Sequence, residues 1–181
     1  MEGIEILRIL AFSASNSSVS INRELVEYAA SLADGHAIET LDIHDYEMPI
    51  YRHDREEADG IPQKAHDFLE RIGAVDALIV SFAEHNGNFT AAWKNLFDWC
   101  SRVRPDVWQD KPMLLLATSP GQRGGRNVLD LATAAIPRFS GQVIGRMTVP
   151  SFNDAFDKDA GKLTDSDLDK ELRGLVAKLT G

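Results

Sequence analysis

Residues 81–99 read SFAEHNGNFTAAWKNLFDW, and this stretch indicates the fold of the chain. It continues an apolar run at residues 77–80 and passes through the polar, glycine-containing segment EHNGN. A helical pattern begins directly afterwards, with apolar side chains at the spacing i, i+3, i+4 and i+7: Trp93, Leu96, Phe97 and Cys100. A buried strand that ends in a loop opening a helix is the usual ligand-binding corner of an α/β sheet. Residues 13–22 and 119–125 form two more such corners, so three loops are expected to converge on one ligand.

The second corner also carries a family signature. Residues 83–88 (AEHNGN), followed by KN at 94–95 and DW at 98–99, resemble the P-E-Y-N-x-S … L-K-N-x-x-D-W signature of the NAD(P)H-dependent FMN reductases. That family has a flavodoxin-like fold. Four positions differ in residue type while the spacing is kept: Ala83 for proline, His85 for tyrosine, Asn88 for serine and Trp93 for leucine. The resemblance implies FMN contacts along the loop, beside the ring and ribityl chain: Ala83, Glu84, His85, Asn86, Gly87 and Asn88.

Strand-like and helix-like segments alternate along the sequence. Short apolar runs predict five parallel strands: residues 6–12, 37–43, 74–82, 113–119 and 142–149. Helical patterns predict five helices: residues 22–32, 61–72, 90–102, 125–139 and 166–179. The alternation predicts the α/β class, with three layers and a doubly wound, five-stranded parallel sheet. The resemblance to the FMN reductases implies that this fold is flavodoxin-like, with the strand order 2-1-3-4-5. Residues 1–181 are expected to form one FMN-binding domain, with segments 45–60 and 150–165 as surface loops near the site.

The first corner, residues 12–22 (FSASNSSVSIN), is dense in hydroxyl groups. Hydroxyl donors and the free N–H groups of a helix start can bind a terminal phosphate without a lysine. The family pattern G-S-x-R-x-x-S-x-N is kept at Ser13, Ser20 and Asn22, but Ser15 stands in place of the arginine and the loop is two residues longer. The predicted phosphate contacts are Ser13, Ser15, Ser18, Ser20 and Asn22. The alternative is a serine-rich turn in which Ser20 only caps the helix.

The third corner, residues 118–125 (TSPGQRGG), resembles the S-x-G-x-x-G-G loop of the same family. Its glycines are expected to let backbone N–H groups face the pyrimidine edge of the flavin. The predicted contacts are Ser119, Pro120, Gly121, Gly124 and Gly125. Two interpretations remain for Arg123 and Arg126: contact with the phosphate of NAD(P)H, or simple exposure to solvent. Segment 41–51 resembles the family's L-x-D-Y-x-x-P-x-Y and is expected to border the substrate mouth or a dimer interface.

Composition excludes several other classes of protein. A formal net charge of −9 argues against a general nucleic-acid binder. The single cysteine, Cys100, excludes an internal disulfide and fits a reducing compartment. The N-terminus has no basic region and the apolar runs stay below the ~18 residues of a membrane span, so no membrane association and a cytoplasmic location are expected. The histidines are scattered singly, so no metal site is predicted.

Together these features predict an NAD(P)H-dependent, FMN-containing oxidoreductase of the FMN/quinone reductase type. Hydride would pass from NAD(P)H to bound FMN and on to a small-molecule electron acceptor, with no side chain acting as a catalyst. FMN is expected rather than FAD, because the serine-rich loop suits a terminal phosphate. Two alternatives remain open: a flavodoxin-like electron carrier, and a cofactor-free binding or regulatory relative.

A homodimer or higher homo-oligomer is also expected. Trp93 and Trp99 project in different directions from a helix of 3.6 residues per turn. A helix that is apolar on more than one side needs a second packing surface, which a symmetric partner would provide. The alternative is that both tryptophans pack under long loops of the same chain. Lys94, Asn95 and Asp98 are expected to fix the loop structure rather than to act chemically.

Overall fold

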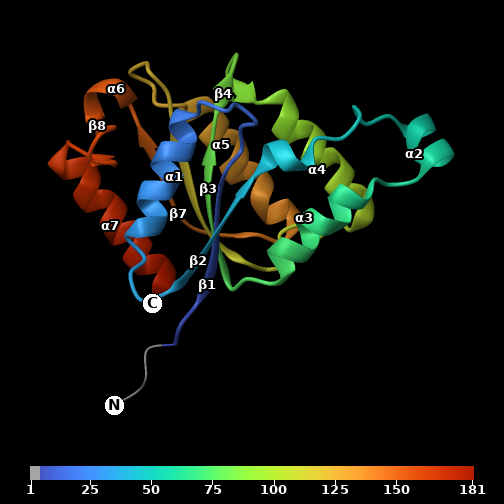
Figure 1. The fold of residues 1–181 in the computed structure, drawn as a ribbon, viewed down its shortest axis with the longest axis horizontal. Helices are drawn as coiled ribbons and strands as arrows, with labels where there is room; N and C mark the ends of the chain where they lie inside the picture. The colour runs from blue at the N-terminus through green and yellow to red at the C-terminus, as the bar shows by residue number, and fades with distance from the viewer. Residues whose placement is uncertain (1–4) are drawn as a thin grey trace.

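A five-stranded parallel sheet forms the centre of the computed structural model, which describes residues 5–181 (Figure 1). The strands are β1 (Arg8–Ser13), β2 (Ala37–Asp42), β3 (Ala77–Phe82), β6 (Pro112–Thr118) and β7 (Gln142–Val149). They lie in the order β2-β1-β3-β6-β7, and each neighbouring pair is parallel. In terms of the main strands this is the order 2-1-3-4-5. The predicted fold class and strand order are therefore confirmed.

The strand register places the carboxyl ends at a common edge of the sheet. Ser13, the last residue of β1, pairs with Asp42 of β2 and with Ser81 of β3. Thr118, at the end of β6, pairs with Val149 at the end of β7. Because the strands end together, the loops that follow them begin side by side.

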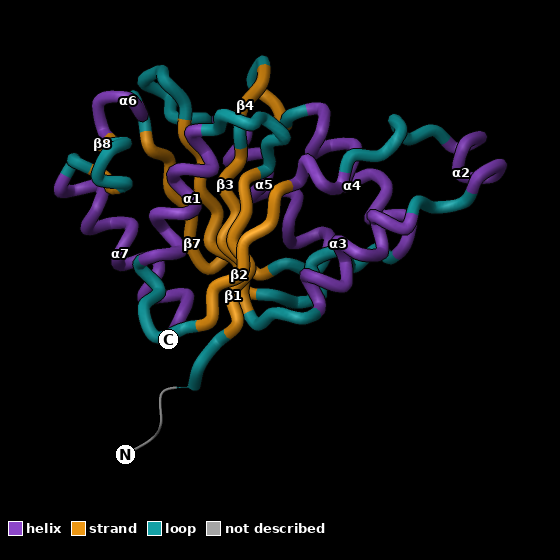
Figure 2. The backbone as a smooth tube through the Cα atoms, in the orientation of Figure 1, coloured by secondary structure: helices purple, strands orange, loops and turns teal. Residues whose placement is uncertain are grey.

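Helices cover both faces of the sheet (Figures 1 and 2). Their bounds are α1 (Ile21–Ser31) and α7 (Ser166–Thr180) on one face, and α3 (Gln63–Gly73), α4 (Ala91–Val103) and α5 (Arg126–Ala135) on the other. A short 3-10 turn, η2 (Ile136–Phe139), continues α5. The predicted helix at 125–139 is thus divided in two, since Pro137 cannot donate the backbone hydrogen bond that an α-helix needs there.

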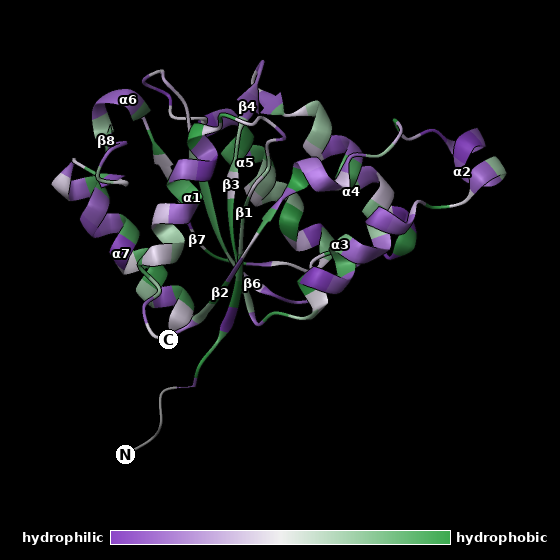
Figure 3. Cartoon of the chain, in the orientation of Figure 1, coloured by the Kyte–Doolittle hydropathy of each residue, from purple (hydrophilic) through white to green (hydrophobic). Residues whose placement is uncertain are grey.

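Alternate side chains of each central strand enter opposite cores. In β1, Leu10 and Phe12 belong to the core beneath α3, α4 and α5. Ile9 and Ala11 point the other way and belong to the core beneath α1 and α7. All six residues of β3 are buried. This burial on both faces explains the continuous apolar runs of the sequence. In Figure 3 the central strands of the sheet are mostly coloured as hydrophobic, whereas α2 is mostly hydrophilic.

The two long connections contain more structure than the sequence predicts. Residues 45–60 are expected to be a loop. They include the end of the 3-10 turn η1 (Ile43–Tyr46) and all of α2 (His53–Asp59). Residues 150–165 contain α6 (Phe152–Ala155) and the hairpin of β8 (Phe156–Asp157) with β9 (Lys162–Leu163). The residues of α2 are all exposed or half-buried, and the other elements are only two to four residues long. Segments so short or so polar leave no apolar periodicity to detect.

The two tryptophans of α4 pack inside their own chain. Trp93 is 3% exposed and lies against the ring of Phe12, with 5.8 Å between ring centroids. Trp99 is fully buried, and its indole N–H donates to the carbonyl of Pro49 at 2.8 Å. The segment after β2 is therefore the second packing surface of α4. The argument that these side chains require a partner chain is wrong, because the core covers Trp93 and a loop of the same chain covers Trp99.

The remaining polar residues of the K-N-x-x-D-W motif fix the same segment. Asn95 accepts a hydrogen bond from the backbone N–H of Tyr51 at 2.8 Å and donates to the carbonyl of Met48 at 3.0 Å. Lys94 and Asp98 form an i, i+4 ion pair at 2.7 Å on the exposed side of the helix. This is the structural role expected for these residues. The motif attaches the segment after β2 to α4.

Burial raises the pKa of the Cys100 thiol to about 12, so this cysteine stays protonated and unreactive at neutral pH. Across residues 5–181, the structure contains no helix with the length and apolar character needed to cross a membrane.

A polar cluster joins α1 to α7 behind the sheet. The hydroxyl of Tyr28 donates to Asp169, and Arg173 donates to both of these residues, at 3.1 Å and 2.8 Å. Partial burial works to raise the pKa of Asp169, but the hydrogen bonds from Tyr28 and Arg173 outweigh it and hold the pKa below its ordinary value. The ionised carboxylate therefore stabilises the folded chain.

We expect Tyr28→Phe to lower the free energy of unfolding by about 1–2 kcal/mol at pH 7, because it removes a hydrogen bond to a charged group. The pKa of Asp169 is lower in the folded chain than in the unfolded chain. Its contribution to stability is therefore complete above the ordinary Asp pKa of about 3.9, and it is lost as the pH falls through the folded-state pKa. Urea unfolding at pH 7 and at pH 3 should show a smaller difference between wild type and variant at the lower pH. An equal difference at both pH values would contradict this role of Asp169.

Candidate functional site

The first loop joins β1 to α1 and presents several hydroxyl groups near the start of that helix. Ser20 is the N-cap of α1, and its Oγ accepts from the backbone N–H of Arg23 at 3.3 Å. The hydroxyls of Ser13 and Ser20 lie 3.4 Å apart, which is long for an O–H···O bond, so both retain capacity for another partner. Ser15 is buried and Ser18 is exposed. Ser20 thus caps the helix, as the alternative interpretation has it, while lying beside Ser13.

The side chain of Asn22 is committed to the sheet rather than to the loop. Its Oδ1 accepts from the hydroxyl of Ser81 at 2.8 Å and from the backbone N–H of Thr118 at 3.0 Å. Its Nδ2 donates to the carbonyl of Thr118 at 3.1 Å. This differs from the expectation that the Asn22 side chain contacts a phosphate. What this residue offers a ligand is its backbone N–H in the first turn of α1.

The second loop forms a small hairpin that the sequence interpretation missed. Strands β4 (Glu84–His85) and β5 (Asn88–Phe89) pair antiparallel across the turn residues Asn86 and Gly87. The φ angles of those two residues are 53° and 75°, as a two-residue Asn-Gly turn requires. The dipeptide Asn-Gly between short strand-like segments was the available signal. His85, Asn86 and Asn88 are exposed on this hairpin, which makes them accessible to a ligand.

Two hydrogen bonds tie the second loop to its neighbours. Thr90, the N-cap of α4, accepts from the backbone N–H of Trp93 at 3.1 Å and donates to the carbonyl of Ala14 at 3.0 Å. Glu84 accepts from the backbone N–H of Val128, in the first turn of α5, at 2.9 Å. The second loop is therefore fixed to the first loop on one side and to the third corner on the other.

The third loop requires glycine for steric reasons. Gly124 has φ +57°, and a Cβ there would lie 2.9 Å from the backbone nitrogen of Pro150. Gly125 has φ +77°, and a Cβ there would lie 3.1 Å from the side chain of Ala117. Both glycines are buried. Gly124 lets its backbone pack against the backbone of Pro150, and Gly125 lets its backbone pack against the side chain of Ala117. Pro120 and Gly121 are exposed and form the accessible part of this loop.

The structure brings the predicted residues together at one edge, in three loops linked by hydrogen bonds. Four residues of this arrangement were absent from the predicted set: Arg23, Ser81, Thr90 and Thr118. Thr90 was detectable, because a threonine directly before a helical pattern is a typical N-cap. Ser81 and Thr118 gave no local signal, since their partner lies far away in the sequence.

The chemistry of the donors suits an anionic ligand with a flat polar edge. Hydroxyl groups and a helix start at the first loop are donors for a phosphate. Accessible backbone at the second and third loops supplies hydrogen-bonding groups without side-chain bulk. In open α/β sheets, a ligand binds outside the carboxyl ends of the strands, where the strand order reverses. Here that place lies between β1 and β3, beside the first and second loops.

The strand order and this site define a flavodoxin-like protein. The family model for NADPH-dependent FMN reductases matches residues 7–154, so the chain belongs to that family. An NADPH:quinone oxidoreductase of Arabidopsis thaliana is 32% identical over 126 residues, which cover 67% of this chain. An NAD(P)H-dependent FMN reductase of Pseudomonas aeruginosa is 34% identical over 119 residues, which cover 65% of this chain. The matched part spans 63% of the length of each of these relatives.

A solved structure resembles this chain over almost its full length. It is FerB, a flavoenzyme NAD(P)H:(acceptor) oxidoreductase from Paracoccus denitrificans, with a TM-score of 0.75 and 25% sequence identity. The similarity covers 97% of this chain and 96% of that one.

We expect Asn22→Ala to lower the free energy of unfolding by about 2–4 kcal/mol, because it leaves buried polar groups of Ser81 and Thr118 without partners. Urea or thermal unfolding measures the change. Asn153→Ala is the matched control, since Asn153 is exposed on α6 and its loss should change stability by less than about 0.5 kcal/mol. Equal stability of the two variants would contradict the role of Asn22 as the tie between α1 and the sheet.

Proposed function

We propose that this protein is an FMN-containing oxidoreductase that takes hydride from NAD(P)H and reduces a small acceptor such as free FMN or a quinone. The observation that carries the proposal is the set of three linked loops at the carboxyl ends of β1, β3 and β6. Membership of the NADPH-dependent FMN reductase family supports it. The activities for which the two relatives are named, quinone and FMN reduction, support this class of acceptor.

The residues present fit FMN. The phosphate end would be held by the hydroxyls of Ser13 and Ser20, with Ser15, Ser18 and the backbone N–H of Asn22 nearby. The flavin would be bordered by the hairpin and by the third loop: Ala83, Glu84, His85, Asn86, Gly87, Asn88, Ser119, Pro120, Gly121, Gly124 and Gly125. When bound, FMN supplies the redox chemistry, accepting hydride and passing electrons to the second substrate.

The role of the protein chain would be to bind the flavin, to orient it and to shield it from water. Backbone N–H groups at the accessible part of the third loop, around Gly121, would donate to the carbonyl edge of the flavin ring. Such hydrogen bonds favour the form of the flavin that carries more negative charge. The hydrogen bonds through Glu84 and Thr90 hold the loops in fixed positions, so the orientation of a bound ring is set before a substrate arrives. We assign no side chain to proton transfer or to nucleophilic attack.

The purified protein should carry, or take up, a yellow cofactor that runs as FMN in chromatography after release by heat. It should then oxidise NAD(P)H when a quinone or free FMN is supplied. Recovery of FAD would contradict the assignment of the cofactor. Bound FMN without NAD(P)H oxidation would favour an electron carrier of the flavodoxin type. A colourless protein that binds no added flavin would favour a cofactor-free relative.

We also propose a homodimer that functions in the cytoplasm. The support for the dimer is the segment after β2, where Ile50 is 78% exposed. This segment and the start of α4 border a cavity of about 410 Å³, lined in part by Tyr46, Met48, Ile50, Tyr51 and Ala91. A second copy of the chain would cover this apolar surface, and two-fold pairs are the commonest oligomers.

Sedimentation at micromolar concentration should give twice the 20.0 kDa of one chain. Ile50→Glu should shift the protein towards the monomer, because it places a charge in the proposed interface. Ile6→Glu is the control, since Ile6 is 68% exposed beyond the opposite end of β1 and should leave the mass unchanged. A wild-type mass near that of a single chain would remove the proposal.

A further inference from the structure

The first loop lacks the positive charge that a phosphate requires. Residues 13–22 contain five serines and two asparagines but no lysine or arginine. A phosphate monoester carries a charge of about −1.5 to −2 at neutral pH, whereas a helix start offers only about half a positive charge. The formal net charge of −9 opposes binding of an anion still further. A cation near the loop would offset part of both effects.

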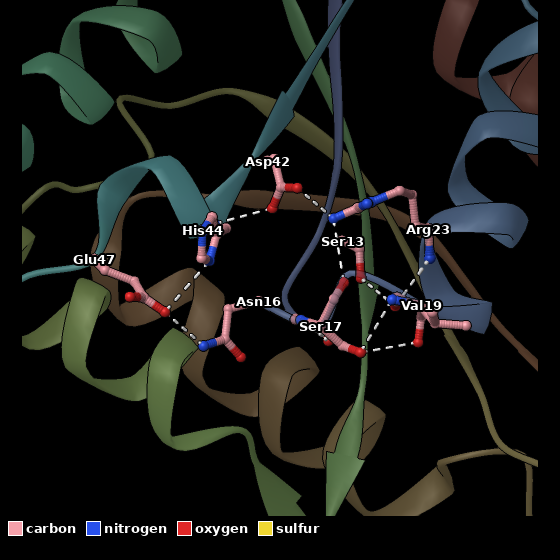
Figure 4. Close-up of polar contacts among 10 residues, drawn as sticks. Ser13, Asn16, Ser17, Val19, Arg23, Asp42, His44 and Glu47 are labelled. Atoms are coloured by element: carbon pink, nitrogen blue, oxygen red, sulfur yellow. Dashed lines mark hydrogen bonds and ion pairs between the residues drawn. The ribbon is translucent and has the colours of Figure 1, made fainter.

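Arg23 brings such a cation to the loop from the first turn of α1. Its guanidinium donates to the carbonyl of Ser17 at 3.4 Å and forms an ion pair with Asp42, as Figure 4 shows. Its backbone N–H is held by the cap residue Ser20. The side chain is 29% exposed, so its charge is less screened by water than that of a free surface arginine.

Two other cations on neighbouring elements are engaged elsewhere. Arg71 pairs with Glu39 at 3.0 Å, and Lys158 pairs with Glu24 at 3.5 Å. Arg23 differs from these two because its guanidinium makes a hydrogen bond to the loop itself.

Asp42 sets the position of the guanidinium. One of its oxygens accepts from the backbone N–H of His44 at 2.9 Å, which caps η1, and the other pairs with Arg23. Asp42 lies opposite Ser13 in the strand register, so the ion pair is anchored at the end of the sheet. The carboxylate also offsets part of the positive charge of the guanidinium.

We propose that Arg23 is the residue by which this chain selects a flavin carrying a terminal phosphate over the same flavin without it. It would supply the charge that the family places at the position of Ser15. The inference rests on the proposed function, because it assumes that a flavin binds at the three loops.

The test compares FMN with riboflavin, which lacks the phosphate, in titrations of the flavin-free protein followed by flavin fluorescence. Arg23→Gln should raise the Kd for FMN at least about tenfold and change the Kd for riboflavin by less than about twofold. Arg8→Gln is the matched control. It makes the same change of charge and breaks a comparable ion pair, with Asp76 at 3.2 Å, at the opposite end of β1. Both of its Kd values should equal those of wild type.

Three results would overturn the assignment or its basis. Wild-type affinity for FMN in folded Arg23→Gln would show that the charge comes from elsewhere. An equal loss for FMN and riboflavin would make Arg23 a structural residue of the loop. A wild-type protein that binds neither flavin would instead remove the proposed function itself. Circular dichroism checks the fold of each variant.

A measurement on the wild-type protein removes the dependence on a folded variant. The NMR signal of the Arg23 side-chain Nε–H, assigned with Arg23→Lys, should move when FMN is added and stay in place with riboflavin. The same response to both flavins would contradict a contact with the phosphate.

Discussion

The hydrogen bonds of one buried side-chain amide hold together the edge of the sheet at which the strands end and the three loops begin. Asn22 joins the first turn of α1 to the ends of β3 and β6, through Ser81 and Thr118. The hydroxyl of Thr118 continues the connection to the carbonyl of Val149 in β7, at 2.6 Å. Buried polar groups are costly unless they are paired, so this network specifies one position for α1 relative to the strand ends. The first loop joins β1 to α1, so fixing α1 also fixes the end of this loop.

A second set of contacts fixes the outer border of the site. Asn95 and Trp99 attach the segment after β2 to α4, and Thr90 ties the start of the same helix to the first loop. The family motif in this helix is therefore scaffolding for the loops rather than a set of chemical groups. Rigid loops suit a bound planar cofactor, because little ordering has to occur when it binds.

The electrostatics of the site oppose the charge of the molecule as a whole. An acidic protein that binds a phosphate must concentrate positive potential locally. In the proposed site the sources are the start of α1, the hydroxyl groups of the first loop and the guanidinium of Arg23. The pairing of Arg23 with Asp42 keeps this cation in place at the cost of part of its charge. If the proposed site is correct, specificity for a phosphate depends on a few contacts at a single loop.

The sequence by itself determined the fold class, the strand order and the positions of the three loops. The fold class and the loop positions follow from local patterns: apolar runs for strands buried on both faces, helical spacing in residues 91–103, and glycines where the backbone turns. The strand order followed from the resemblance of the motifs to a known family. Only the tertiary structure decided what individual polar side chains do. Asn22 fits a phosphate loop by pattern but bonds to strand ends far away in the sequence, and Trp99 packs under a distant loop rather than against a partner. Such assignments depend on which groups the fold brings within hydrogen-bonding distance, and local periodicity carries no information about that distance.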